Sequence, residues 1–259
     1  MRKAPRYAAL LGLALAGVLL AACGGDDEGE PASTGTAVAP SPTPVPAGST
    51  AEERDAAGPI LMAAALLPED LPEGFTFDEE RFLTNEESVD EDLDYPGAAT
   101  LEDYSRWGQI LEYEAEYSRE TPPTLTGATL SMQVTTILYR DSTGADESFE
   151  FVREQTSDPE YIKAQEQKSA EEGQPIRDVS ISPISFPGVG DNRMAFELRF
   201  TMYAPNFQRD LDFVAQAVAI RRGRAIGAIE TLAVGSPHPL EEVEALARTL
   251  DERMKDALE

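Results

Sequence analysis

The chain has 259 residues and a formal net charge of −27, with 41% hydrophobic and 7% aromatic residues. Such a negative charge repels polyanions and argues against a nucleic-acid partner. The hydrophobic content suffices for a core of ordinary size, which argues against disorder throughout the chain. The only cysteine is Cys23 and the only histidine is His238, which excludes an intramolecular disulfide and a zinc site built on Cys and His ligands.

The first 22 residues have the organisation of an export signal peptide. A basic start at residues 2–6 precedes an apolar run over residues 8–20, which at about 13 residues is too short to span a bilayer. The run ends in Leu20-Ala21-Ala22-Cys23, which resembles the lipobox of bacterial prolipoproteins. This resemblance implies cleavage before Cys23, a diacylglycerol on its sulfur, and a cell-membrane location facing the extracytoplasmic side. A cleaved, freely soluble secretory protein is the alternative.

The stretch from Cys23 to residue 58 is rich in Gly, Ser, Thr, Pro and Ala and has almost no residue to bury. This composition predicts a disordered linker with a mean span on the order of 30 Å. Residues 59–259 are then expected to form a single folded domain.

The predicted domain begins with a short helix over residues 60–67, which Pro68 ends. After an acidic stretch, residues 107–117 alternate in polarity, and residues 130–138 alternate again, which predicts two paired strands. In the residues that follow, the apolar positions have helical spacing, which predicts two helices. The predicted helices begin at Asp141 or Ser142, with Ala145, Phe149 and Val152 on one face, and at Pro159, ending near residue 172.

Four more strands are predicted over residues 179–186, 193–203, 211–222 and 225–234, of which the last two form a hairpin. Pro239 opens a closing helix that carries one apolar stripe. The stripe consists of Leu240, Val243, Leu246, Ala247, Leu250 and Met254. We therefore expect an α+β fold, an antiparallel sheet of about six strands with helices packed on one face, and we expect the closing helix to cover the apolar side of residues 193–203.

Four features of the domain occur in the same order in the PsbP-like lipoproteins of bacteria. They are Leu71-Pro72-Glu73-Gly74-Phe75, the Trp107-Gly108 pair, the Gly190-Asp191 pair and the closing helix. Residues 60–258 loosely resemble that family, whose folds are mostly binding or assembly modules. The resemblance implies a role in binding and supplies no catalytic residues.

Two charged groups of residues are candidates for chemistry. Arg221, Arg222 and Arg224 gather at one hairpin tip, which predicts a tentative site for phosphate, a lipid headgroup or an acidic polymer, with an ordinary polar tip as the alternative. Glu112, Glu114 and Glu116 share one strand face, where they attract a cation or a basic partner unless cross-strand Arg or Lys neutralises them.

Two further patterns are weaker. Asp90, Asp92 and Asp94 have the spacing of a calcium loop, but Tyr95 occupies the place of the required glycine, so an acidic loop is expected instead. His238 lies between two prolines and is expected at the surface.

These patterns together predict a membrane-anchored extracytoplasmic lipoprotein that binds a ligand or an envelope partner, without enzymatic activity, metal or cofactor. Two alternatives stay open. One is a hydrolase built on two of the 48 acidic residues, and the other is a structural envelope protein without a ligand.

Overall fold

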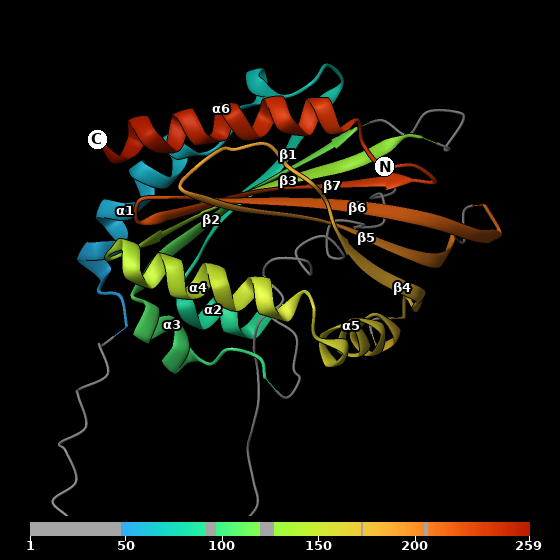
Figure 1. Ribbon diagram of the computed structural model, residues 1–259, viewed down its shortest axis with the longest axis horizontal. Coiled ribbons are helices and arrows are strands. Elements are labelled where there is room, and N and C mark those ends of the chain that lie inside the picture. Colours follow the sequence, from blue (N-terminus) through green and yellow to red (C-terminus); the bar gives the residue numbers. More distant parts are fainter. Residues whose placement is uncertain (1–47, 92–96, 120–126, 172, 205–206) are drawn as a thin grey trace, which may run out of the picture.

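The structure is a computed structural model that describes residues 48–91, 97–119, 127–171, 173–204 and 207–259. The described residues form a seven-stranded antiparallel sheet in the order β1-β2-β3-β7-β6-β5-β4, with helices on both faces (Figure 1). In chain order the elements are α1 (Ala51–Ala64), η2 (Pro68–Asp70), β1 (Phe75–Leu83), α2 (Asn85–Glu91), α3 (Leu101–Trp107), β2 (Gln109–Arg119), β3 (Thr129–Tyr139), α4 (Ser142–Gln155), α5 (Pro159–Glu171), β4 (Ile176–Pro183), β5 (Asn192–Ala204), β6 (Arg209–Arg222), β7 (Ala225–Val234) and α6 (Leu240–Leu258).

The sheet consists of two meanders, runs of strands that pair with their neighbours in sequence. One meander comprises β1 to β3 and the other comprises β4 to β7. Pairing between β3 and β7 joins them, and in this pairing Gln133 lies opposite Glu230 and Val134 lies opposite Ile229. The segment that contains α4 and α5 makes the connection between the two meanders.

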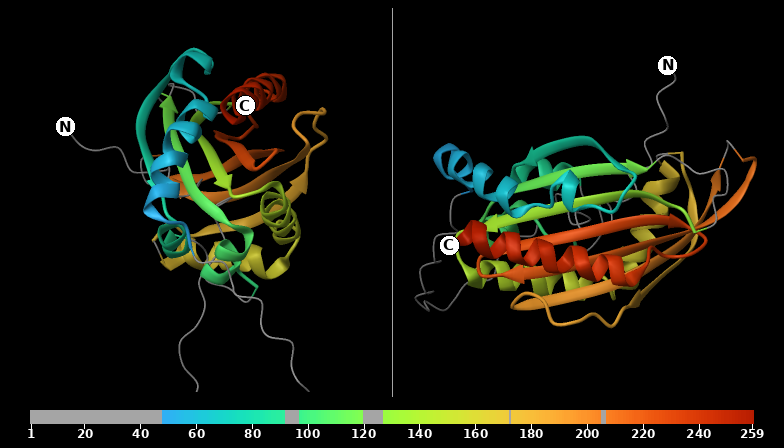
Figure 2. Two further views of the ribbon diagram at one scale, coloured as in Figure 1. Left: turned by 90° about the vertical axis from the view of Figure 1, so that its left-hand side faces the viewer. Right: turned by 90° about the horizontal axis from the view of Figure 1, so that it is seen from above.

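Helices α1 and α6 cover one face of the sheet, here called the upper face (Figure 2). Its core joins both helices to β2, β3, β6 and β7. Gly227 on β7 allows α6 to lie close, because a Cβ there would come within 2.6 Å of Met254 Sδ. The principal buried side chains are Leu61, Leu111, Tyr113, Val134, Val218, Ile229, Val243, Leu246, Leu250 and Met254.

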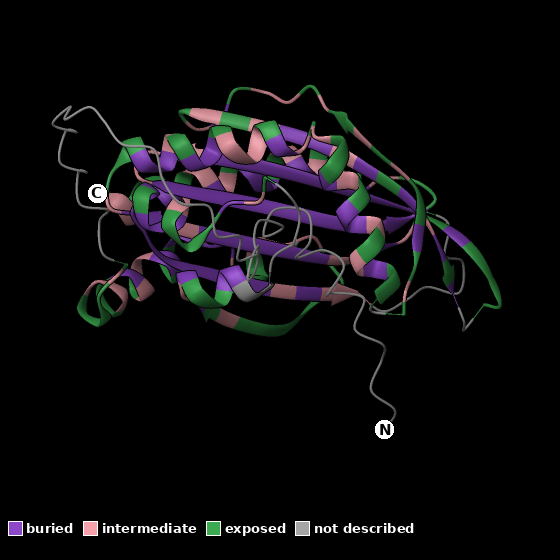
Figure 3. Ribbon diagram, turned by 90° about the horizontal axis from the view of Figure 1, so that it is seen from below, coloured by how far each residue is buried: buried purple, intermediate pink, exposed green. Residues whose placement is uncertain are grey.

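Helices α2, α3, α4 and α5 lie on the opposite face, here called the lower face (Figure 1). At one end of this face, Trp107 and Phe149 pack with Tyr139 and with small residues of β6 and β7. At the other end, Phe200 and Phe213 stack with ring centroids 5.4 Å apart. Figure 3 views this face and shows that the central strands carry buried residues along most of their length.

Side chains at the helix starts fix where three helices begin. Thr50 and Glu53 form a capping box at α1, and Thr100 and Asp103 form another at α3. Asp141 Oδ1 accepts a hydrogen bond of 2.9 Å from the backbone N–H of Gly144 at α4. Each of these caps satisfies backbone donors that the first turn of a helix leaves without a partner.

The predicted α+β class is confirmed, and the structure differs from the expectation in detail. The sheet has seven strands. The additional strand is β1, which was not predicted because most of its residues are exposed and several are acidic. Helices lie on both faces, and α6 covers the upper face, whereas the apolar side of β5 belongs to the lower face. The predicted linker end at residue 58 falls inside α1, since the Thr50 cap starts this helix at Ala51.

Within the described ranges, no helix combines the length and the hydropathy that a membrane span requires.

Candidate functional site

A row of glutamates on β2 faces the lower side of the sheet. The row consists of Glu112, Glu114 and Glu116, and it alternates with upper-face residues such as Tyr113 and Ala115. Glu112 is only 3% exposed and Glu114 only 1% exposed, while Glu116 is partly buried. The alternation was correctly predicted, and helices also cover this side of the sheet.

The two buried members of the row have partners on neighbouring elements. Glu114 accepts hydrogen bonds from Arg81 Nε at 2.6 Å and from Gln133 Nε2 at 2.9 Å. Glu112 accepts a hydrogen bond of 3.0 Å from the hydroxyl of Ser88 on α2. Pairing by a cross-strand arginine, one of the two expectations for the row, is therefore confirmed for Glu114.

Glu230 brings another carboxylate to the same face from β7. Its residue is 2% exposed, and its Oε2 accepts no hydrogen bond within the described part of the chain. Burial raises the pKa of this carboxyl well above its usual value, and the charges of Glu114 and Glu112 raise the pKa further. These effects favour the protonated form of the Glu230 carboxyl.

Gln133 lies on β3 between the glutamate row and Glu230. It is 3% exposed and stands directly opposite Glu230 in the strand register. Its Nε2 is committed to Glu114, which turns its Oε1 away from that carboxylate. Among the described residues this Oε1 accepts no hydrogen bond, and neither does Oε2 of Glu230 on the adjacent strand.

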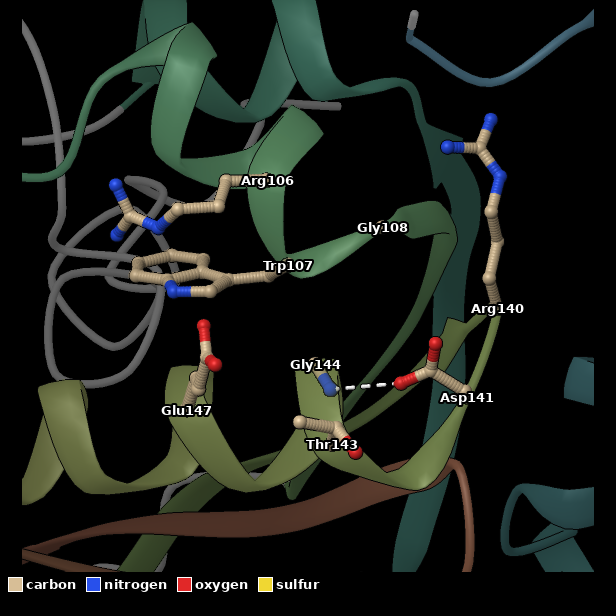
Figure 4. Close-up of a pocket in the computed structure, with 8 residues that line it drawn as sticks. All are labelled: Arg106, Trp107, Gly108, Arg140, Asp141, Thr143, Gly144 and Glu147. Atoms are coloured by element: carbon tan, nitrogen blue, oxygen red, sulfur yellow. Dashed lines mark hydrogen bonds between the residues drawn. The ribbon is translucent and has the colours of Figure 1, made fainter. Parts of the chain in front are cut away.

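A small pocket lies at the junction of α3 and α4 (Figure 4). Its volume is about 160 Å³, smaller than the roughly 300 to 1,000 Å³ of drug-sized ligand sites. Arg106 stacks over the Trp107 ring and pairs with Asp103, while Arg140 points away and pairs with Glu53. Because both guanidiniums are engaged by carboxylates, the pocket does not offer a strong anion site. Its lining consists of Arg106, Trp107, Gly108, Arg140, Asp141, Thr143, Gly144 and Glu147.

The arginines of the predicted anion site lie at the β6–β7 tip and contact aspartates from several elements. Arg221 pairs with Asp146 on α4 and with Asp191. Arg222 makes two hydrogen bonds, of 2.7 and 2.6 Å, to the carboxylate of Asp251 on α6, and it also pairs with Asp191.

Arg224 donates to the backbone oxygen of Tyr139 at 3.1 Å. An anion at this tip would have to compete with the aspartates that already contact its neighbours, and anion binding by Arg221, Arg222 and Arg224 stays a prediction.

His238 is buried, so the expectation of a surface position is wrong. It is 2% exposed and packs edge-on against Phe75. Its Nδ1 lies 2.7 Å from Thr129 Oγ1, and its Nε2 lies 3.2 Å from Glu242 Oε2 without hydrogen-bond geometry. Burial lowers the pKa of the imidazole, which favours the neutral ring.

Several sequence expectations fall outside the described residues. They are lipidation of Cys23, the linker up to residue 47, and the acidic loop containing Asp92 and Asp94. Within the described ranges, no three or more His, Cys, Asp or Glu side chains are placed to hold a metal ion.

The chain matches no protein-family model and no curated protein. Among solved structures it is similar to the extracellular domain of PknH from Mycobacterium tuberculosis. The similarity covers 80% of this chain and 98% of that chain, with 10% sequence identity and a TM-score of 0.39. These values are too low for the likeness to identify a function or a site.

Proposed function

We propose that this protein is an extracytoplasmic lipoprotein, tethered by a diacylglycerol on Cys23, whose α+β domain binds a ligand or an envelope partner. The lipobox resemblance of residues 20–23 supports the tether, and the buried glutamates on the lower face support the binding role. The proposal includes no enzymatic step and no cofactor.

The lower face supports a binding role because its buried polar groups destabilise the fold when they lack hydrogen-bond partners. A buried polar group without a hydrogen-bond partner destabilises the fold by about 1 to 3 kcal/mol, and an apolar residue would fit the same sheet position without that penalty. In β7 every residue is buried, and Glu230 is the only charged one. A ligand that hydrogen-bonds to this carboxyl would give the residue a role beyond folding.

The tether is tested by mass spectrometry of the membrane fraction. We expect the mature chain to begin at Cys23 and to carry a diacylglycerol mass there. A Cys23→Ala variant should leave the membrane fraction and appear in soluble form, because two acyl chains are what hold the protein in the bilayer. Detection of unmodified Cys23 in a freely diffusing native protein would rule out the tether.

Binding is tested by native mass spectrometry of the protein purified from its own membrane. We expect a non-covalent adduct whose occupancy falls in a Glu230→Gln variant. If the occupancy of the adduct is the same in Glu230→Gln as in the wild type, the ligand binds at a site other than the lower face. A mass equal to that of the bare lipoprotein under all purification conditions would favour the structural envelope protein that the sequence leaves as an alternative.

A further inference from the structure

His238 connects the start of α6 to the sheet. It lies in the short segment of residues 235–239 that joins β7 to α6, and its side chain is 1% exposed. The ring meets Phe75 of β1 edge-on, with centroids 6.4 Å apart. Its Nδ1 lies 2.7 Å from Oγ1 of Thr129 on β3. A side chain from a short connection is therefore buried between two strands of the sheet.

The start of α6 depends on this contact because the helix has no side-chain cap. Helices α1, α3 and α4 each begin with a side-chain hydrogen bond, whereas α6 begins after Pro239 without one. The backbone oxygen of Pro239 accepts from the N–H groups of Glu242 and Val243 at 3.0 and 3.2 Å. Pro237 and Pro239 restrict the backbone on both sides of His238. Displacement of the His238 side chain would therefore disturb the first turn of α6.

The surroundings of the imidazole favour the neutral ring. Its Nε2 is buried and makes no hydrogen bond within the described part of the chain. Glu242 on α6, 3.2 Å from Nε2, favours the charged ring, and Arg119 on β2, stacked 4.6 Å over Phe75, opposes it. The contacts from β1 and β3 come from Phe75 and Thr129, which carry no charge. Burial is the largest effect and lowers the pKa of His238 below its usual value of 6.5.

From these contacts we infer that His238 is an acid-sensitive switch, which holds the start of α6 against β1 and β3 while its ring is neutral and releases it when the ring takes up a proton from solvent. Phe75 and Val243 belong to the upper-face core beside this contact, so release exposes apolar surface at this corner of the domain. The switch goes beyond the proposed binding function and does not depend on it.

The direction of the pH effect follows from the lowered pKa of His238. Above pH 6.5, the ordinary pKa of a released imidazole, the ring is neutral in both states and the contact contributes fully. The contribution declines as the pH falls from 6.5 towards the lower pKa of the closed state. Each unit between the two pKa values changes the equilibrium between the closed and open forms about tenfold. Mildly acidic solution should therefore open this corner.

The first test is an NMR titration of the full-length protein in detergent, purified without a histidine tag and with isotope-labelled histidine. His238 is the only histidine, so the label gives a single ring signal, and we expect its midpoint below pH 6.5. Glu242→Gln should lower the midpoint further, because it removes the charge that favours the imidazolium. Glu241→Gln is the matched control, since it removes the same charge from the exposed neighbouring position. Its midpoint should equal that of the wild type.

Hydrogen exchange, corrected for intrinsic exchange rates, locates the release. Between pH 7.5 and pH 5 the protection of the first turn of α6 should fall about threefold or more in the wild type, while the protection of β7 should not fall. His238→Asn keeps a polar group near Thr129 and does not titrate in this range, so it should abolish the fall.

The wild-type titration and the two glutamate variants decide the matter if His238→Asn folds poorly. A midpoint at or above pH 6.5, equal shifts in Glu242→Gln and Glu241→Gln, or protection of α6 that is the same at both pH values would each overturn the inference. An equal loss of protection in β7 would overturn it as well, because the whole domain would then unfold in acid.

Discussion

Glu230 is the residue whose polarity differs most from that of its surroundings, since it is the single acidic side chain in a strand whose ten residues are all buried. Its sequence, Ala-Ile-Gly-Ala-Ile-Glu-Thr-Leu-Ala-Val, already contains the signal, because one acid interrupts an otherwise apolar run. A search for clusters of charge does not find such a single acidic residue. The glutamates of β2 were found, but alternating polarity looks the same whether the polar face meets water or meets other helices.

The raised pKa of Glu230 predicts a pH-dependent stability. The folded state keeps a proton that the unfolded chain loses above its ordinary pKa of 4.5. The contribution of this proton to stability is complete below pH 4.5 and declines as pH rises towards the folded-state pKa. Glu230→Gln should therefore have a higher urea midpoint than the wild type at pH 7, and the gap should close as the pH approaches about 4.5.

Circular dichroism during urea unfolding across that pH range checks this expectation. Glu252→Gln, which removes an exposed charge, should show no such closing gap. A difference between Glu230→Gln and wild type that stays constant with pH would contradict the assignment of the proton to Glu230.

The second prediction at the scale of single residues concerns Gly144. A Cβ at this position would come within 1.7 Å of the backbone oxygen of Trp107, and backbone cannot swing aside as a long side chain does. Gly144→Ala should destabilise the fold by about 1 to 3 kcal/mol through overpacking between α3 and α4. Gly188→Ala is the control, since nothing lies within 4 Å of its added Cβ. Thermal unfolding that is equal for the two variants would refute the close approach.

At the scale of elements, prediction succeeded where the apolar pattern is strong and failed where it is weak. β7 and the start of α6 were placed correctly because a mostly apolar run and a single apolar stripe each match one kind of element. β1 was missed because five of its residues in succession are exposed, leaving no alternation to detect. The face of the sheet that α6 covers was predicted wrongly. Alternation in a strand shows that one face is apolar, but it does not show which helix packs on that face.

Arg222 connects two elements, the β6–β7 hairpin and α6, through its paired hydrogen bonds to Asp251. Arg222→Met should cost about 1 kcal/mol, because the pair is only partly shielded from water. Hydrogen exchange should quicken selectively in the C-terminal half of α6. Arg248→Met removes an exposed i, i+4 pair with Glu244 and should change stability by less than about 0.5 kcal/mol. Uniform exchange in both variants would show that the Arg222 contact does not hold the helix.

For the whole molecule, charge is the dominant property. A net charge of −27 makes the folded chain repel itself, and compaction increases that repulsion. Salt screens charges over about 10 Å at 0.1 M, so the melting temperature should rise between 20 and 300 mM sodium chloride. Sucrose at matched osmolality is the control. A melting temperature that falls with salt would mean that the ion pairs outweigh the repulsion.

The joint between β3 and β7 is where the early and late halves of the chain meet, and Gln133 and Glu230 lie within it. Within each meander the paired strands follow one another along the chain, whereas this joint pairs residues far apart in sequence, so we expect it to form late in folding. Because burial raises the pKa of the Glu230 carboxyl, pairing of the two halves takes up protons at pH values between the unfolded and the folded pKa. The pH therefore affects the rate of folding as well as the stability of the folded state. Refolding should slow as the pH rises through the range between the two pKa values, because this one step takes up the proton.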